Sequence, residues 1–252
     1  MLENKEFESN NFPQSEDVLN QENAPKKQGD FPLWKRAVLL AIGSIGLELI
    51  AIIVTFVALG IPKSDRSGAV NLITYSILVV ALVGLIASDV TKFIPRFKKW
   101  QPYVFGIAFG VGIIITDNAY LNFIDLLYTS SVSVNETNIR SVIDIFPVAS
   151  VFIFGLVGPL CEELTYRVGL FGLPRKFNRI LAYAVSALVF GFLHFTFTAT
   201  DIVKEFLLLP SYIGSGVALA AAYDLFDLPC SWTAHSINNL WAIITHIIIT
   251  RM

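Results

Sequence analysis

Two adjacent carboxylates stand in the middle of a long apolar run of this sequence. Glu162 and Glu163 are followed by Arg167, and the flanking stretches VFIFGLVGPL and VGLFGL carry no charge. A charged side chain at the centre of a membrane-spanning helix costs about 2.5–3.5 kcal/mol and by default marks a functional site. The two glutamates are therefore candidates for acid–base or metal chemistry in a place where water is scarce.

Helical spacing separates the roles of the two glutamates. Glu163 and Arg167 are i,i+4 neighbours with the acid on the N-terminal side, the favourable orientation for an ion pair. Glu162 points about 100° away and has no such partner on its own helix. Small or helix-loosening residues, which would leave room for water or substrate, follow the Glu162 face: Gly155, Gly158, Pro159 and Gly169. We therefore expect Glu163 to be structural and Glu162 to be free to act.

The three histidines of the chain all lie in apolar segments. A basic turn joins the segments of Glu162 and His194, and a helical rise of about 1.5 Å per residue places the two side chains roughly 20 and 22 Å from the same membrane face. His235 and Asn239 are i,i+4 neighbours and share a helix face. His246 lies on that face too. We interpret it as an interhelical hydrogen-bonding residue, with a supporting role at the site as the alternative.

These residue types fit two kinds of hydrolytic chemistry. Glu162 in a low-dielectric cavity could act with His194 to hold and activate a water molecule. His235 and Asn239 are then donors suited to a developing oxyanion, as in peptide hydrolysis. Alternatively, Glu162 or Glu163 could coordinate a catalytic Zn²⁺ with His194 and His235, because a carboxylate and two imidazoles form one known zinc set. The compact helical motif HExxH is absent, and the sequence leaves both mechanisms open.

The composition predicts the elements that hold these residues. The chain has 252 residues, of which 54% are hydrophobic and 15% charged, against about 25% charged in soluble domains. The charges are clumped, which leaves apolar stretches of the length that crosses a bilayer as a helix. We predict an all-α fold, a polytopic transmembrane bundle of about seven spans (six to eight) with the catalytic residues around an intramembrane cavity. The predicted segments are 37–61, 69–88, 102–116, 147–173, 180–200, 204–223 and 231–250.

The polar residues predict the domain organisation and the orientation. Residues 1–33 are predicted to be a disordered polar tail, and 34–252 a membrane domain with its catalytic core at about 145–245. Lys and Arg gather in the flanks that face the cytoplasm when the N-terminus is inside. No basic cluster indicates nucleic acid. Cys161 and Cys230 are interpreted as buried thiols.

Three short motifs resemble those of the CPBP intramembrane proteases, also called the CAAX protease/Abi family, which includes the type II CAAX prenyl endopeptidases. The family motifs EExxxR, FxxxH and HxxxN correspond here to Glu162–Arg167, Phe190–His194 and His235–Asn239. Each motif is short, but their order and their placement in apolar helices resemble the family over roughly residues 145–245. Val168 departs from the pattern, because the family often has Gly at that position.

The resemblance implies an intramembrane endopeptidase in which Glu162 activates water with His194. It also implies that His235 and Asn239 stabilise the oxyanion and that Arg167 supports the first motif. Family members are commonly labelled metalloproteases, and a metal-free glutamate mechanism fits as well.

The expected partners are membrane lipid and a membrane-associated or lipidated peptide or protein, with no nucleic acid. The expected location is the plasma membrane of a bacterium, with the N-terminus cytoplasmic. The role is either CAAX-type processing or bacteriocin processing and self-immunity. The alternatives are a catalytically silent membrane immunity or binding protein and an ion- or proton-coupled transporter.

Overall fold

Apolar segments of the sequence form long helices in the computed structural model, which describes residues 31–128 and 132–252. Residues Pro32–Met252 form one compact unit. The predicted polar tail, residues 1–33, lies almost wholly outside the described residues. In chain order the helical elements are α2 (Leu33–Ala41), η1 (Ile42–Gly46), α3 (Leu47–Val57), η2 (Ala58–Gly60), α4 (Lys63–Ile86), η3 (Ala87–Asp89), α5 (Val90–Phe97), α6 (Gln101–Asp125), α7 (Val134–Ile145), α8 (Pro147–Phe152), η4 (Ile153–Val157), α9 (Gly158–Glu163), η5 (Leu164–Phe171), η6 (Pro174–Lys176), α10 (Arg179–Leu193), α11 (Ile202–Phe226) and α12 (Leu228–Arg251).

Five helical stretches are long and apolar enough to cross a membrane, which confirms the predicted polytopic helical bundle. They are Leu33–Gly60, Arg66–Asp89, Gln101–Asp125, Pro147–Phe171 and Ile202–Phe226. The third extends well beyond the predicted end at residue 116.

The two remaining predicted segments differ from this pattern. The helix of the predicted segment 180–200 ends at Leu193, so α10 is apolar but only 15 residues long. The predicted segment 231–250 lies in α12, which has 24 residues but is not among the five candidate spans. Polar residues of the third motif, including His235 and Asn239, lower its hydropathy. A count of seven spans by length and composition is therefore not reached in the described residues.

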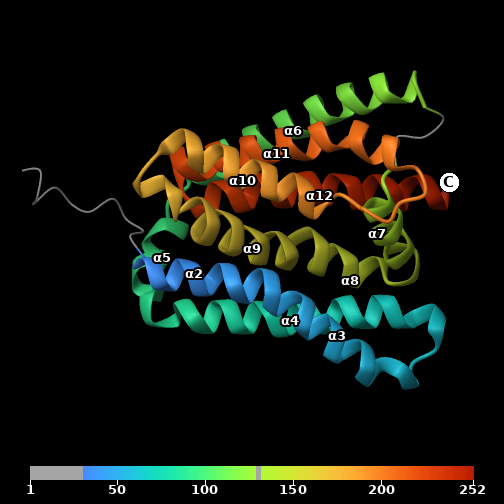
Figure 1. Ribbon diagram of the computed structural model, residues 1–252, viewed down its shortest axis with the longest axis horizontal. Coiled ribbons are helices and arrows are strands. Elements are labelled where there is room, and N and C mark those ends of the chain that lie inside the picture. The colour runs from blue at the N-terminus through green and yellow to red at the C-terminus, as the bar shows by residue number, and fades with distance from the viewer. Residues whose placement is uncertain (1–30, 129–131) are drawn as a thin grey trace, which may run out of the picture. The chain divides into compact units, whose positions relative to one another are not determined.

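The helix that carries the two glutamates runs through the middle of the bundle. Figure 1 shows α8 and α9 between the blue and teal helices α2–α4 and the orange and red helices α10–α12. The α2 helix packs against η5, α10 packs against η5 and α11, and α12 packs against α6, α11 and α9. The first motif thus lies between two groups of helices and contacts both.

Close approach at a glycine joins the first helices to this middle segment. A Cβ atom placed on Gly43 would lie 1.7 Å from the Thr165 hydroxyl oxygen, so only glycine fits there. Nearby, the buried Arg36 donates a hydrogen bond to the backbone oxygen of Val168 at 2.6 Å. These two contacts hold η1 and α2 directly against the segment that contains Arg167.

Ion pairs join the helices at the end of the bundle where α5 lies. Arg96 contacts Asp227 between α11 and α12 at 2.9 Å, and Arg175 and Arg179 both contact Asp224 at 2.8 and 2.7 Å. Lys35 of α2 pairs with Asp89. Figure 1 shows α5 and the first turns of α2 at the same end of the bundle. This is the end that the charge distribution predicts to be cytoplasmic.

Candidate active site

The segment Pro147–Phe171 changes helix type on both sides of the glutamates. The five residues of η4 before α9 and the eight residues of η5 after it are π-helical. Pro159 in α9 has no backbone N–H and its ring clashes with the carbonyl four residues earlier, which accounts for the loosened turn in η4. Wide turns of this kind are common at functional sites. Glu162 and Glu163 end the short α9, and Arg167 lies in η5.

Glu163 and Arg167 form the predicted ion pair at the centre of the protein. Both side chains are fully buried, and the Arg167 Nε lies 3.2 Å from the Glu163 Oε2. This contact does not meet hydrogen-bond geometry, so the attraction is mainly that of opposite charges. Arg167 also donates to the Ser186 hydroxyl at 2.9 Å and lies over the Phe190 ring. The guanidinium is therefore held by three different side chains.

His235 of α12 lies between the two glutamates. Its Nδ1 is 3.0 Å from the Glu163 Oε1, and its Nε2 is 3.8 Å from the Glu162 Oε2. Because a carboxylate can only accept, His235 Nδ1–H is the donor to Glu163. That bond leaves Nε2 on the side of Glu162. The first and third motifs, more than 70 residues apart, thus meet in one cluster.

His194 is the C-cap residue of α10. The ring of Phe190 lies between it and His235. Its Nδ1–H donates to the backbone oxygen of Phe190 at 2.8 Å, so Nε2 is free in the neutral ring. The Phe190 ring contacts the rings of His194 and His235, with centroids 4.7 and 5.6 Å away. On its other side His194 stacks on Tyr212 at 4.8 Å. Glu162 interacts with His194 electrostatically, but no hydrogen bond joins these two among the described residues.

Asn239 and His246 lie farther along α12 and have different surroundings. Asn239, one turn after His235, donates from Nδ2 to the backbone oxygen of Phe154 at 2.9 Å. The second N–H of the Asn239 amide remains available to donate another hydrogen bond. His246 contacts Asp144 of α7 at 2.8 Å, and the Asp144 side chain is 52% exposed. The interpretation of His246 as an interhelical hydrogen-bonding residue is confirmed.

Glu162 differs from its neighbour in that it is partly open. Its side chain is 23% exposed, whereas Glu163 is fully buried, and Glu162 accepts no hydrogen bond from the described part of the chain. The predicted space beside it is wrong at two glycines. A Cβ on Gly155 would meet Leu240 of α12, and one on Gly169 would meet Leu40 of α2. These glycines allow helices to approach closely, because the π-helical turns rotate the later residues off the face that a regular α-helix predicts.

The donor atoms for a metal ion are of the right kind but do not gather into a site. His194 and His235 both keep Nε2 free of a hydrogen bond, the state in which imidazole binds zinc, and two carboxylates lie beside His235. No group of three or more His, Cys, Asp or Glu side chains in the described residues is placed to hold a metal ion. The predicted ligand set therefore does not fit zinc as these side chains lie.

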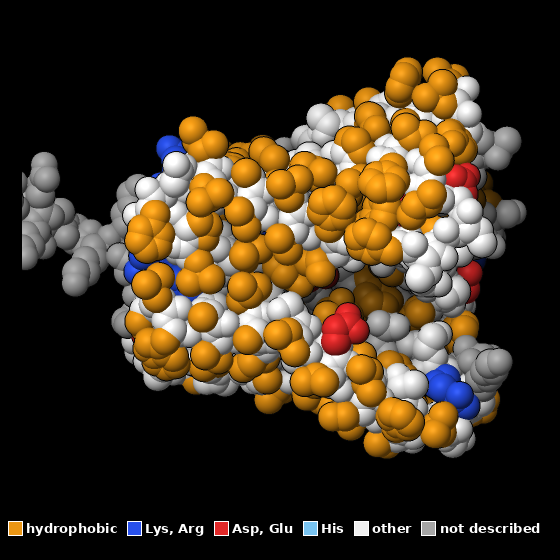
Figure 2. Space-filling view, viewed as in Figure 1, with side chains coloured by type: hydrophobic (Ala, Val, Ile, Leu, Met, Phe, Trp, Pro, Cys, Tyr) orange, Lys and Arg blue, Asp and Glu red, His pale blue; other side chains and the backbone are white. Residues whose placement is uncertain are grey.

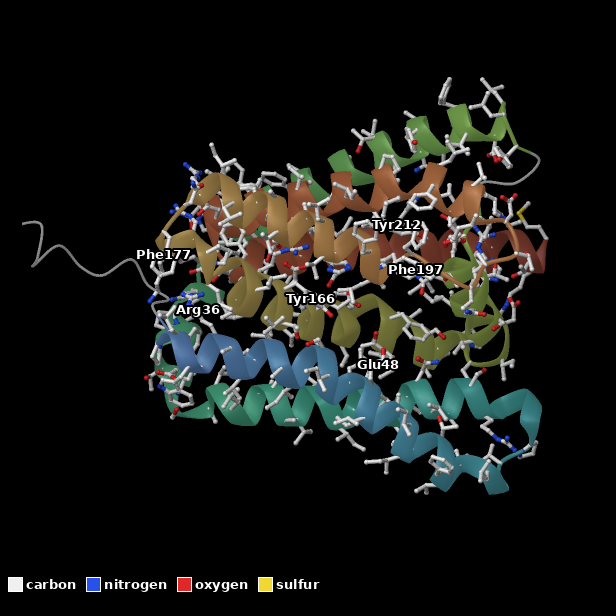
Figure 3. All side chains as sticks on the ribbon, in the orientation of Figure 1. Arg36, Glu48, Tyr166, Phe177, Phe197 and Tyr212 are labelled. Carbon is white, nitrogen blue, oxygen red and sulfur yellow. The ribbon has the colours of Figure 1, made fainter. Side chains whose placement is uncertain are left out.

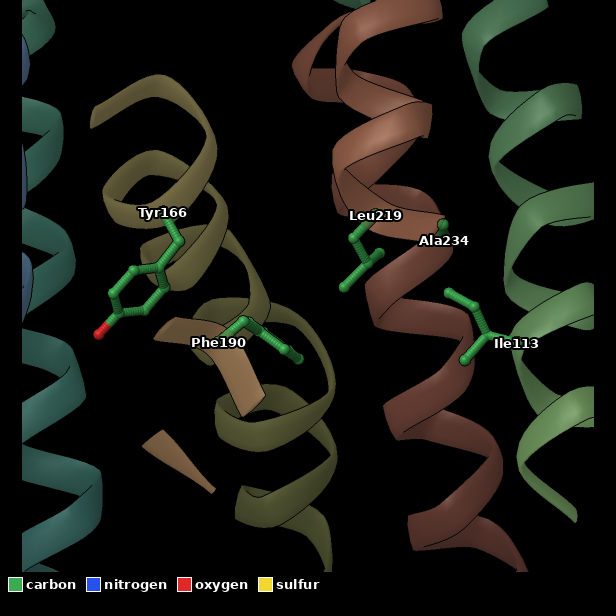
Figure 4. Packing of buried hydrophobic residues seen from close by; sticks show 5 residues of the cluster. All are labelled: Ile113, Tyr166, Phe190, Leu219 and Ala234. Atoms are coloured by element: carbon green, nitrogen blue, oxygen red, sulfur yellow. The ribbon is translucent and has the colours of Figure 1, made fainter. Parts of the chain in front are cut away.

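Several residues around the site were not found from the sequence. Ser186 contacts Arg167, and Tyr212 contacts His194. Neither residue is marked by a spacing pattern in the sequence. Tyr166 contributes to the core cluster with Phe190, as Figure 4 shows. Their positions depend on how α10 and α11 are turned toward the middle segment, which helix periodicity alone does not specify.

A comparison with known protein families supports the motif resemblance. Residues 144–241 match the family model described as type II CAAX prenyl endopeptidase Rce1-like. The family suggested by the motifs is thereby confirmed. The match covers all three motifs, from the first glutamate to Asn239. This segment is therefore similar to the CAAX-type intramembrane proteases.

Two further comparisons add little to the CAAX-protease match. An uncharacterized protein of Mycoplasma capricolum subsp. capricolum is 32% identical over 101 residues, which is 40% of this chain. The chain covers 28% of the length of that relative. No solved structure matches.

Proposed function

We propose that this chain is an intramembrane endopeptidase that hydrolyses a peptide bond of a membrane-associated or lipidated peptide with a water molecule activated by Glu162. The observation that carries the proposal is the position of His235, 3.0 Å from the buried Glu163 and 3.8 Å from the partly open Glu162. One carboxylate is occupied in holding the histidine, and the other has no hydrogen-bonding partner among the described residues. A general base needs a carboxylate that is free to take a proton, as Glu162 is, and the neighbouring donor His235 must be held in one orientation, as it is by Glu163.

In the first step Glu162 removes a proton from water as the water oxygen attacks the peptide carbonyl. The free Nε2 of His194 accepts a hydrogen bond from the same water and orients it. The second N–H of Asn239 donates to the oxygen that becomes negative. His235 adds a second donor at Nε2 when that nitrogen carries a proton, since Nδ1–H remains bonded to Glu163. In the second step Glu162 returns its proton to the departing amine nitrogen as the C–N bond breaks.

The buried groups position this machinery rather than react. Glu163 orients the His235 ring, and Arg167 balances the charge of Glu163. Tyr212 holds His194 by stacking, and its own hydroxyl bonds to the Ser133 hydroxyl at 2.8 Å. Each of these contacts restricts a ring whose orientation decides where its nitrogen points.

We propose that the water-activation step proceeds without a metal ion. The sequence allowed a Zn²⁺ site at Glu162 or Glu163 with His194 and His235, whereas the described side chains do not converge on one point. Peptidase activity of purified protein is expected to survive dialysis against EDTA. A loss that added Zn²⁺ restores, and Mg²⁺ does not, would show that a metal takes part.

The cellular setting of this activity is also proposed. We place the chain in the plasma membrane of a bacterium with its N-terminus in the cytoplasm, because Lys and Arg are concentrated at the end of the bundle where α2 begins. CAAX-type processing, or bacteriocin processing with self-immunity, fits a substrate held at the membrane.

The test compares cells that express the wild type or Glu162→Gln at equal levels. The substitution keeps the size of the side chain and removes the base. Mass spectrometry of the N- and C-termini of membrane proteins is expected to find termini that the wild type produces and Glu162→Gln does not, with a rate loss on the order of 10²–10⁴. Glu136→Gln, at a partly exposed side chain of α7, is the matched control and is expected to retain the cleavage.

Identical termini in all three strains would contradict the protease. If a phenotype such as peptide resistance then persisted in Glu162→Gln, the chain would be a silent immunity or binding protein. If ion or proton flux in vesicles depended on Glu162 while the termini did not, it would be a transporter.

A further inference from the structure

Glu48 is a carboxylate in the first candidate span that the site described above does not use. It is the only charged residue between Arg36 and Lys63, and it lies in α3 within the span Leu33–Gly60. Its side chain is exposed, and it forms no hydrogen bond or ion pair within the described part of the chain. At about 1.5 Å per residue, Glu48 is roughly 22 Å from Leu33 and roughly 18 Å from Gly60, near the middle of the bilayer.

Glu48 and Glu162 interact electrostatically with the phenol groups of the same two tyrosines, Tyr75 and Tyr166. The Tyr75 ring lies edge-on to Phe154, the residue whose backbone oxygen binds Asn239. In Figure 4 the hydroxyl of Tyr166 points away from Leu219 and toward the blue and teal helices. The Tyr166 hydroxyl is therefore directed toward the group of helices that carries Glu48.

The surface beside Glu48 is hollowed. Figure 2 shows an acidic side chain at the edge of a depression with apolar walls, and Figure 3, in the same orientation, labels Glu48 at that place and Phe197 across from it. Phe197 lies in the chain just after His194 and is 71% exposed. A ligand that enters here from the membrane meets apolar side chains and one negative charge.

We propose that Glu48 forms a subsite for a cationic side chain, Lys or Arg, of a peptide that approaches Glu162 from within the membrane. A charge within a membrane span is tolerated where an opposite charge pairs with it. The long apolar stem of Lys or Arg suits the apolar rim, and its charged head can reach the carboxylate. Lipid head groups are a poor occupant, because Glu48 lies near mid-bilayer. This inference rests on the proposed function for the identity of its ligand as a substrate.

The test measures binding rather than cleavage, so that it does not depend on turnover. Full-length Glu162→Gln protein in phosphatidylcholine nanodiscs is titrated with a set of fluorescent farnesylated peptides. Within the set, Lys, Gln or Glu is placed in turn at each residue flanking the Cys. For at least one position we expect the Lys peptide to bind about tenfold tighter than the Gln peptide. Adding Glu48→Gln is expected to bring that ratio to about one, and Glu48→Lys to favour the Glu peptide instead.

Equal Lys-to-Gln ratios with and without Glu48 at every position would overturn the proposal. A uniform weakening of all peptides by Glu48→Gln would also overturn it, because a structural effect has no charge preference. Glu136→Gln, far along the chain on α7, is the control and is expected to leave the ratios unchanged. If the wild type cleaves none of these peptides while the Glu48-dependent ratio persists, the protease fails and the cationic subsite stands.

Discussion

The charged residues of the first and fourth candidate spans differ in burial and in pairing. Over an apolar stretch of 18 residues within Pro147–Phe171, 50% of the residues are buried inside the protein, whereas within Leu33–Gly60 the share is 17%. The buried span carries Glu163 and Arg167, which are fully enclosed and paired. The exposed span carries apolar side chains such as Phe56, at 70% exposure, and the single carboxylate of Glu48.

This difference shows that a charged residue in a membrane helix can have one of two roles. Inside the bundle, charges that satisfy one another hold helices in place, and Glu163 binds α9 to α12 through His235. On the surface, a charge with no partner in the described chain is available to a ligand. Glu162 lies between these extremes, since it is next to the buried pair yet 23% exposed.

The largest effect should come from breaking the buried pair. Arg167→Met leaves Glu163 charged and enclosed, which is expected to lower the unfolding free energy by about 3–5 kcal/mol. The double variant Glu163→Gln with Arg167→Met removes both charges and should lose less than the single one. Unfolding in mixed detergent micelles, followed by tryptophan fluorescence, measures this. Glu162→Gln is the matched change on the neighbouring residue and should alter stability by less than about 1 kcal/mol. A single variant as stable as wild type would contradict the comparison.

A second prediction compares the same change, glycine to alanine, at a tightly packed position and at an open one. Gly43→Ala places a Cβ within 1.7 Å of Thr165 on the buried segment, and the forced shift is expected to cost about 1–3 kcal/mol. At Gly84 of α4 nothing lies within 4 Å of the added atom. Gly84→Ala should therefore be neutral or stabilise by up to about 1 kcal/mol through helix propensity. Equal melting temperatures for the two variants would show that η1 and η5 do not pack as closely as described.

The stack between Tyr212 and His194 is expected to affect catalysis more than folding. Tyr212→Ala removes the ring, and kcat should fall about tenfold, equivalent to roughly 1.4 kcal/mol, with little change in KM. Tyr212→Phe keeps the stacking ring and loses only the bond to Ser133, so it should retain most of the rate. If Phe failed to restore kcat, the hydroxyl rather than the ring would be what positions His194.

The smallest effect is predicted for an ion pair outside the bundle core. Glu136 and Arg140 are i,i+4 neighbours on α7 with side chains 33% and 41% exposed. Glu136→Gln should change the unfolding free energy by about 0.3–0.5 kcal/mol and this change should shrink at high salt. A loss as large as that of Arg167→Met would mean that exposure does not separate structural charges from incidental ones.

Much of the helix pattern and the Glu163–Arg167 pair could be predicted, because both depend on residues close together in the chain. The end of α10 at Leu193 could not be predicted, since the following residues include Phe195 and Phe197 and no glycine or proline marks the end of the helix. The contact of His235 with both glutamates could not be predicted either, because it joins segments more than 70 residues apart. The sequence shows Glu48 as a lone charge in an apolar run. Its role depends on which side chains lie beside it, which the sequence does not specify.

The sequence alone determined the all-helical membrane fold, the three motifs and the local i,i+4 pair, because hydropathy and helical spacing act within a segment. The tertiary structure decided which glutamate is enclosed and which is open. That choice depends on the rotation of α9 between its two π-helical neighbours and on the packing of α12 against it. Rotation and packing are set by contacts between distant segments, such as those of Gly155 with Leu240 and Gly43 with Thr165, and no periodicity within one helix encodes them.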